Sequence, residues 1–410
     1  MNWASATASP PARNWTKNFR FIPDMKIAQH IWPIIFGVCI LASGITGYVW
    51  QTNKKAHVEA APHSSEEARD TRTDALSLQL FQHALNDKTG NVIVAPGIVH
   101  DLLRDLQTIA GGKTLDAINA LPISPEPSSH IDRFSLVAAD INLHRTTPHQ
   151  NILTLPFSED YPLALSLFNS LLAKYTPYPN LQFATSDNTS ARTKLLGGAT
   201  AYFTPRWKIP FDKVNSQQAD FDSASGRMPK FHQMRARGAY RTAKADDASW
   251  QAVAIELEQP GNNSTPLVFV AILPATPARA FAAGLTPESL TAIRTALANA
   301  EPADSLVMLP RMGQIVAPQD FRSTLRQLGL DSLFSDTEAD FSPFCKEQVH
   351  LGAVIYSCGL SLLESQNSTE EDASLEGAET SMEFSRPFFW FVGELNTNSP
   401  MEFMGLLEEM

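Results

Sequence analysis

Cysteine is scarce in this 410-residue chain, which contains only Cys39, Cys345 and Cys358. None belongs to a Cys-x-x-Cys pair, and none lies near a histidine at the spacing of a metal site. We therefore expect no disulfide framework and no zinc site, and no other pattern indicates a metal or a cofactor. We expect Cys358, which stands in an apolar run, to act as a small apolar filler in a strand.

Positive charge is also limited, because 32 Lys and Arg stand against 43 Asp and Glu, which gives a formal net charge of -11. Nucleic-acid binding requires clustered Lys and Arg, so we expect no nucleic-acid partner. The 43% hydrophobic composition is sufficient for a large buried core, and the length allows one large domain or two ordinary ones.

Catalytic motifs are missing as well. The ten histidines show no His-Glu-x-x-His or similar spacing, which gives metal-dependent hydrolysis no support. Ser186-Asp187-Asn188 and Lys88-Thr89-Gly90 resemble two elements of serine β-lactamases. They occur in the wrong order, however, and no Ser-x-x-Lys motif precedes them. We therefore assign no catalytic residue and expect that the protein is not an enzyme.

One long stretch, residues 27–53, has no Lys, Arg, Asp or Glu at all. Its core at residues 32–50, WPIIFGVCILASGITGYVW, has about the 20 apolar residues that cross a bilayer. Trp32 and Trp50 at its ends suit the two headgroup regions. The pattern predicts one transmembrane helix.

Basic residues gather before this helix, which predicts a cytoplasmic N-terminus and an extracytoplasmic remainder, either extracellular or periplasmic. A cleaved signal peptide is the alternative, although its charged region would be unusually long and a small-residue cleavage site appears only near residues 59–61. The predicted divisions are a cytoplasmic tail at 1–31, a transmembrane signal-anchor helix at 32–50, a flexible linker at 51–72 and a folded domain at 73–410.

Several motifs follow one another in the folded region. The first comprises a strand, a Pro96-Gly97 turn, a helix and then Gly111-Gly112-Lys113-Thr114. The others, in chain order, are Tyr202-Phe203, Trp207, Pro210-Phe211, Leu309-Pro310-Arg311, Leu328-Gly329-Leu330, Ala339-Asp340-Phe341-Ser342 and the C-terminal PFFWFV and NSPMEFMGLL. This order resembles the serpin family of protease inhibitors across nearly the whole domain. The resemblance implies an α+β fold in which helices surround a large mixed β-sheet, an exposed reactive centre loop, and a protease as partner.

Two departures from the family pattern concern the main sheet. Ala95 and Ala199 replace the usual Ser and Asn that help this sheet to open. The segment from about Phe134 to Phe183 is predicted to hold a strand at SLVAADINLHR and a helix at YPLALSLFNSLLAKY. Because this segment is shorter than in the family, a helix that covers the main sheet is expected to be trimmed or missing.

A polar acidic segment lies between an apolar run at 349–364 and an aromatic run at 385–407. In serpins a protease cuts this loop as it would cut a substrate. The cut loop then inserts into the main sheet as an extra strand, a form of strand addition. Matching Glu364 to the acidic residue that ends the family's strand makes 365–373 the hinge, where inhibitory members carry small residues. The hinge residues assigned in this way are Glu364, Gln366, Asn367, Thr369, Glu370, Glu371 and Asp372.

Insertion of this hinge would bury an acid in either register, because alternate residues of a strand face the same side. One register buries Glu371, and the other buries Glu370 and Asp372. An unpaired buried carboxylate is strongly unfavourable, whereas each strand hydrogen bond gains only about 0.5–1.5 kcal/mol. The sequence thus predicts a non-inhibitory or weakly inhibitory binding protein. The alternative is that insertion tolerates the acids and that the protein is a suicide inhibitor.

No Lys or Arg lies between Lys346 and Arg386, so the loop offers trypsin-like enzymes no favoured bond. The alternative therefore implies a serine or cysteine protease that cuts after Leu, Glu or a small residue. The position of the cut bond in serpins, counted back from Pro387 or forward from Glu364, defines the candidate scissile region. This region comprises Leu375, Glu376, Gly377, Thr380 and Ser381.

Overall fold

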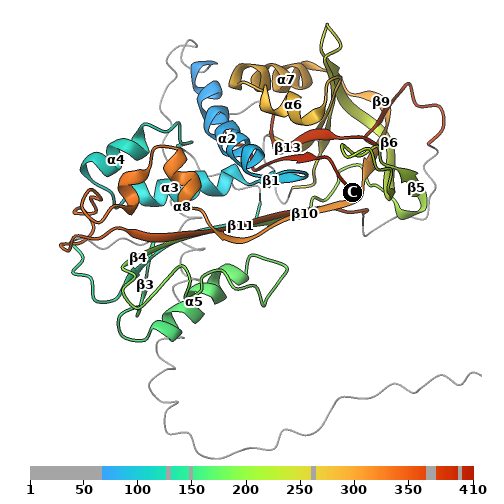
Figure 1. Cartoon of the computed structure of the whole chain (residues 1–410). Helices are drawn as coiled ribbons and strands as arrows, with labels where there is room; N and C mark the ends of the chain where they lie inside the picture. Colours follow the sequence, from blue (N-terminus) through green and yellow to red (C-terminus); the bar gives the residue numbers. More distant parts are fainter. Residues whose placement is uncertain (1–66, 126–130, 147–150, 260–264, 366–374, 396–398) are drawn as a thin grey trace, which may run out of the picture. The chain divides into compact units, whose positions relative to one another are not determined.

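Two β-sheets organise the part of the chain that the structure describes (Figure 1). The structure is a computed structural model, and the residues it describes fall within the unit His63–Met410. They are residues 67–410 with the exception of 126–130, 147–150, 260–264, 366–374 and 396–398.

The first sheet has five strands, and β11 is its most deeply buried. This strand is apolar on both faces, as expected for a strand that is covered on both sides. It pairs in parallel with β4 and antiparallel with β10, so the sheet is mixed. In spatial order the strands are β10 (Met312–Asp320), β11 (Leu351–Leu362), β4 (Leu195–Phe203), β2 (Arg133–Asp140) and β3 (Ile152–Leu155).

The second sheet has nine strands and includes the aromatic C-terminal hairpin, β13 and β14. In order its strands are β1 (Val92–Val94), β14 (Phe403–Leu407), β13 (Phe388–Glu394), β8 (Leu267–Pro274), β7 (Trp250–Glu256), β6 (Lys230–Lys244), β9 (Ala303–Pro310) and β12 (Thr380–Glu383), with β5 (Gln217–Asp220) paired to β6.

Helices cover the sheet faces that do not pack against the other sheet. Figure 1 shows α3 and α5 on opposite faces of the five-stranded sheet, and α2, α6 and α7 together over the second sheet. The helical segments are α2 (Glu67–Asp87), α3 (Pro96–Gln107), α4 (Gly112–Asn119), α5 (Tyr161–Ala173), α6 (Ala278–Ala283), α7 (Pro287–Asn299), α8 (Arg322–Gln327) and two 3-10 turns, Lys213–Asn215 and Asp331–Phe334.

Two helices begin earlier in the chain than the sequence analysis suggested. Helix α2 starts at Glu67, within the stretch that we expected to belong to the linker, and its Glu, Ala and Arg residues are good helix formers. Helix α3 starts at Pro96, which we expected to form a turn. Proline fits the first helical position because its missing N–H would have no partner there.

Helix α5 confirms the helix predicted at YPLALSLFNSLLAKY, whereas the expectation that a helix covering the main sheet is trimmed or missing stays a prediction. Helix α5 has 13 residues and buries Ala164, Phe168 and Leu172, which recur at intervals of four along one face. Phe168 and Leu172 pack so closely on Gly198 of β4 that a Cβ there would lie 2.8 and 2.9 Å from their side-chain carbons. The helix therefore lies directly on the sheet.

The predicted transmembrane helix at 32–50 lies outside the described residues, as do the predicted tail and most of the linker. Within residues 67–410, as far as they are described, no helix has both the length and the apolar character needed to cross a bilayer. Cys345 and Cys358 are buried free thiols. Burial raises the pKa of the Cys358 thiol to about 12, consistent with the small apolar role expected of it.

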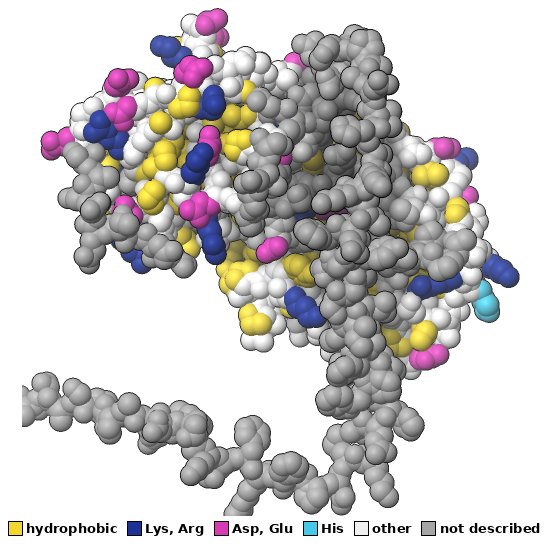
Figure 2. All heavy atoms as spheres, turned by 180° about the vertical axis from the view of Figure 1, so that it is seen from behind, with side chains coloured by type: hydrophobic (Ala, Val, Ile, Leu, Met, Phe, Trp, Pro, Cys, Tyr) yellow, Lys and Arg dark blue, Asp and Glu magenta, His cyan; other side chains and the backbone are white. Residues whose placement is uncertain are grey.

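Charges of both signs mix on the surface. On the face turned away from the viewer in Figure 1, Lys and Arg side chains lie among Asp and Glu side chains, and the described residues there form no broad basic area (Figure 2).

A buried ion pair joins α2 to α7, and its loss should destabilise the domain. Arg294 donates from Nη1 to both oxygens of Asp74 at 2.9 and 2.8 Å and from Nη2 to the Glu394 carbonyl at 2.8 Å. We predict that Asp74→Ala lowers the apparent free energy of unfolding by about 3–5 kcal/mol, because it removes a buried carboxylate that bonds the buried Arg294 guanidinium through both oxygens. Urea denaturation measures this change.

The matched control is Lys230→Ala, which removes an exposed pair with Asp220. It should cost about 1 kcal/mol or less. Similar losses for the two variants would contradict the account.

Candidate functional site

The loop that follows β11 is fixed at its N-terminal root. Trp207 donates from Nε1 to the carbonyl of Leu363 at 2.7 Å, and the Ser365 amide donates to the carbonyl of Phe211 at 2.8 Å. Glu364 between them is buried. Its carboxylate accepts a hydrogen bond from the Ser216 hydroxyl at 3.2 Å and lies 3.8 Å from Arg311. These hydrogen bonds therefore fix the chain where it leaves the sheet.

The strands that an inserting segment would have to separate are in direct contact. β11 pairs with β4 from Leu351 opposite Leu195 to Leu360 opposite Phe203, with one irregularity between Leu351 and Ala353. We call this β4–β11 ladder the seam. Within the described residues no strand lies between the two, so the seam is closed along its length.

A chain of hydroxyl groups crosses the seam on the face that α5 covers. The Ser357 hydroxyl donates to the carbonyl of Val316 on β10 at 2.8 Å, which uses its proton. The Tyr202 hydroxyl, 2.7 Å away on β4, must therefore be the donor to Ser357. This hydroxyl relay links β4, β11 and β10. Burial raises the pKa of the Tyr202 phenol above its ordinary value, so the relay keeps its proton at neutral pH.

A second tyrosine acts on the opposite face of the sheet. Tyr356 is 2% exposed and lies opposite Ala199 across the seam. Its hydroxyl accepts a hydrogen bond from the Ala95 amide at 2.6 Å, at the start of α3. Helix α3 packs on β2 and β4, which lie on the other side of the seam from Tyr356. The tyrosine therefore connects the two sides of the seam at the positions where the family's Ser and Asn are replaced by alanine.

The C-terminal root of the loop lies at the edge of the second sheet. β12 pairs in parallel with β9, and the hydroxyls of Thr380 and Ser305 are 2.7 Å apart. Just before β12, Glu376 and Gly377 form an exposed turn in which Gly377 has a φ of 78°. Arg237 of β6 donates hydrogen bonds to the carbonyls of both turn residues.

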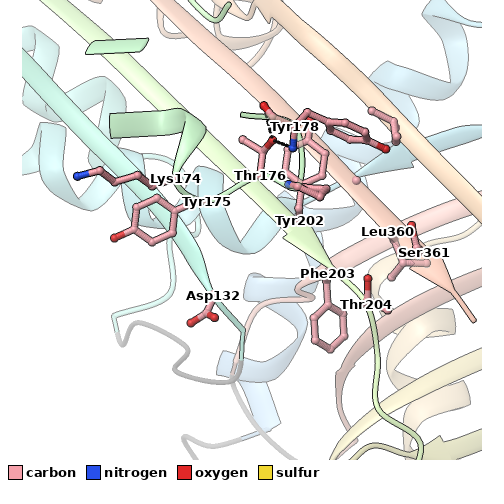
Figure 3. A pocket seen from close by; sticks show the side chains of 13 residues that line it. Asp132, Lys174, Tyr175, Thr176, Tyr178, Tyr202, Phe203, Thr204, Leu360 and Ser361 are labelled. Atoms are coloured by element: carbon pink, nitrogen blue, oxygen red, sulfur yellow. Dashed lines mark hydrogen bonds between the residues drawn. The ribbon is translucent and has the colours of Figure 1, made fainter. Parts of the chain in front are cut away.

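An open cleft of about 440 Å³ lies over one end of the seam (Figure 3). Its walls come from the segment after α5, which carries Tyr175 and Tyr178, and from the ends of β4 and β11. The Tyr202 ring covers Gly359, where a Cβ would lie 2.7 Å from two ring carbons. Bulk at Gly359 would displace the tyrosine of the hydroxyl relay.

A family model described as serpin, serine protease inhibitor, matches residues 145–409. The chain belongs to the serpin family. This confirms the resemblance derived from the sequence and the expected combination of mixed sheets and surrounding helices. The family is described as one of protease inhibitors rather than catalysts, in agreement with the expectation that the protein is not an enzyme. Comparison with curated proteins gives no match.

Solved serpin structures share the fold at low sequence identity. Maspin superposes with a TM-score of 0.72 at 17% identity, covering 85% of this chain and 100% of maspin. A serpin from Manduca sexta, serpin-12, gives 0.69 at 19% identity, with coverages of 83% and 98%. Uncleaved ovalbumin gives 0.71 at 14% identity, with coverages of 83% and 100%. At these identities the likeness establishes the fold alone.

The residues assigned to the serpin loop from sequence fall in three places. Glu364 is the buried anchor at the N-terminal root, whereas Thr380 and Ser381 belong to β12. Leu375, Glu376 and Gly377 lie at or beside the exposed turn. The statement that acids in the hinge hinder insertion stays a prediction, because the other hinge residues lie outside the described residues. These are Gln366, Asn367, Thr369, Glu370, Glu371 and Asp372.

Sequence analysis missed the residues that hold the seam. Tyr356 carries a detectable signal, because a tyrosine in an otherwise aliphatic buried strand must find a hydrogen-bond partner for its hydroxyl. Ser357 carries a weaker signal of the same kind. Arg237 offers none, because its partners in the turn lie about 140 residues further along the chain.

The hydroxyl relay should make the seam harder to open. We predict that Tyr202→Phe speeds hydrogen exchange of the β4 and β11 amides about fivefold, since the lost bond is worth about 1 kcal/mol. Exchange followed by mass spectrometry measures this effect. Tyr175→Phe is the control, because the Tyr175 ring stacks on Phe134 and its hydroxyl lies outside the relay. Equal exchange in the two variants would show that the relay does not hold the seam.

Proposed function

We propose that this serpin is a membrane-anchored, extracytoplasmic protein that binds its partner as a non-inhibitory or weakly inhibitory member of the family. The family description makes a protease the natural partner. The observation that carries the proposal is the seam, which hydrogen bonds hold on both faces of the sheet. A trapping inhibitor must open this seam quickly after its loop is cut.

Opening the seam would break bonds that an incoming strand does not replace automatically. Separation of β4 from β11 takes the Tyr202 hydroxyl away from Ser357. Tyr202 is partly buried, so the loss of this bond costs about 1 kcal/mol. Movement of α3 with β4 would separate the buried Tyr356 hydroxyl from the Ala95 amide, and a buried polar group left without a partner costs about 1–3 kcal/mol.

The composition of the hinge supports the same conclusion. Glu370, Glu371 and Asp372 stand where the first inserting residues would enter the sheet. Each register places at least one of these acids in the packed interior, where an unpaired carboxylate is strongly disfavoured. Initiation would therefore be slow at the point where speed decides whether a protease is trapped or released.

A second function is that of a suicide inhibitor acting on an extracytoplasmic serine or cysteine protease. The exposure of Glu376 and Gly377 favours it, because a protease could approach the turn that they form. The target would cut after Leu, Glu or a small residue and would not be trypsin-like. In this case partner residues or protonation would have to neutralise the acids of the hinge.

The membrane anchor rests on the sequence of residues 32–50, which are apolar, flanked by tryptophans and preceded by basic residues. Residues 51–66 would then connect the anchor to α2, in agreement with a domain displayed outside the cytoplasm. A cleaved signal peptide is the alternative for this stretch.

Incubation with elastase-, chymotrypsin- and Glu-specific proteases distinguishes the two functions. We predict plain cleavage of the loop, no covalent complex on denaturing electrophoresis, and a melting temperature that changes little after the cut. A variant with Glu370→Ala, Glu371→Ala and Asp372→Ala should melt at a higher temperature after cleavage, because its hinge can enter the sheet. A covalent complex formed by the unmodified chain would refute the proposal.

Membrane fractionation examines the anchor separately. The full chain should remain in the membrane fraction after washing with alkaline carbonate, whereas a chain that lacks residues 1–50 and is secreted through a cleavable leader should be soluble. External protease should digest the serpin domain in intact cells. Release of a shortened soluble form from the full chain would instead establish the cleaved signal peptide.

A further inference from the structure

Arg237 holds the exposed turn before β12. Arg237 of β6 donates from Nη1 to the Glu376 carbonyl and from Nη2 to the Gly377 carbonyl, the latter at 3.3 Å. Two consecutive carbonyl oxygens of the loop therefore face one guanidinium. The planar donor fork of arginine suits such paired acceptors.

Asp304 fixes the guanidinium in this position. It accepts hydrogen bonds from Arg237 Nε at 2.9 and 3.1 Å, and Nη2 also contacts it at 2.5 Å. Arg237 holds the pKa of the Asp304 carboxyl below its ordinary value, so the pair stays charged at neutral pH. The backbone of Asp304 accepts a further bond from the Glu379 amide at 3.1 Å, which attaches the far end of the turn to β9.

This arrangement makes the Glu376–Gly377 bond a poor protease substrate for two reasons. A serine protease must direct the carbonyl oxygen of the bond it cuts toward its own oxyanion hole, but Arg237 already binds that oxygen. An extended backbone also suits strand-like docking of a substrate, whereas Gly377 has a φ of 78° in the left-handed region. Cleavage there requires that Arg237 release the turn and that the turn straighten.

We propose that the Arg237–Asp304 pair determines where the loop is cut, because it protects the Glu376–Gly377 bond from proteases that cleave after glutamate. Hydrolysis adds water across that bond and leaves a Glu376 carboxylate and a Gly377 amine, which the intact pair prevents. Cutting is thereby directed to loop bonds on the N-terminal side of the turn. The inference rests on the proposed role of this loop as the segment that a protease meets.

The test uses a glutamate-specific serine protease on the full-length chain in detergent, under conditions in which each molecule is cut at most once. Mass spectrometry gives the ratio of first cuts after Glu376 to first cuts after Glu370 and Glu371. Arg237→Gln should raise this ratio about tenfold or more, because it removes charge-assisted hydrogen bonds to the bond being cut. Asp304→Asn should raise it in the same direction.

Arg235→Gln is the matched control, because Arg235 lies two residues away on the same strand and donates to Gln217 instead of the turn. Its ratio should equal that of the unmodified chain. An unchanged ratio in a folded Arg237→Gln variant would overturn the inference. If that variant does not fold, Arg237→Lys replaces it, since lysine lacks the fork that binds two carbonyls and Asp304 together, and an unchanged ratio there has the same consequence.

The result is independent of whether the protease is trapped. The ratio records where the loop is first cut, whereas a covalent complex on denaturing electrophoresis records whether the protease stays attached after the cut. If the protease is trapped and the ratio rises in Arg237→Gln, the proposed weak inhibition is contradicted. The inference that Arg237 protects the Glu376–Gly377 bond is still supported.

Discussion

The parallel ladder between β4 and β11 is the constraint on which the rest of this serpin depends. Both strands are largely buried, and each has one face toward α3 and the other toward α5. Burial limits water as an alternative hydrogen-bond partner, so polar groups at the seam depend on partners within the protein, although the Thr200 hydroxyl has none among the described residues. Tyr202 and Tyr356 bond across the seam and lose these partners when it opens, whereas Ser357 keeps its bond to Val316 on β10.

The two ends of the loop reinforce this state. At the N-terminal root, Glu364 is buried beside Ser216 and Arg311, and the backbone on either side of it is hydrogen-bonded. At the C-terminal root, β12 is bound to β9, and Arg237 holds the preceding turn. A loop fixed at both roots beside a closed sheet is suited to presenting a surface to a partner. Insertion of the cut segment would require the N-terminal anchor and the seam to be released together.

Much of the fold could be predicted from the sequence, because apolar patterning and ordered motifs are local signals. The apolar run at 349–364 indicates a strand buried on both faces, and Leu351–Leu362 within it form β11. The edge strand Thr380–Glu383 escaped prediction because its residues are mostly polar and its pairing with β9 is a tertiary property. The helix predicted at YPLALSLFNSLLAKY proved to be α5, because its apolar residues recur at helical spacing.

A crystal structure of the protein cut within the loop tests the central claim most directly. The account predicts that β11 remains paired with β4 and that the sheet keeps five strands, with the Tyr202 and Ser357 hydroxyls still in contact. A structure in which residues 366–376 form a strand between β4 and β11 would contradict it.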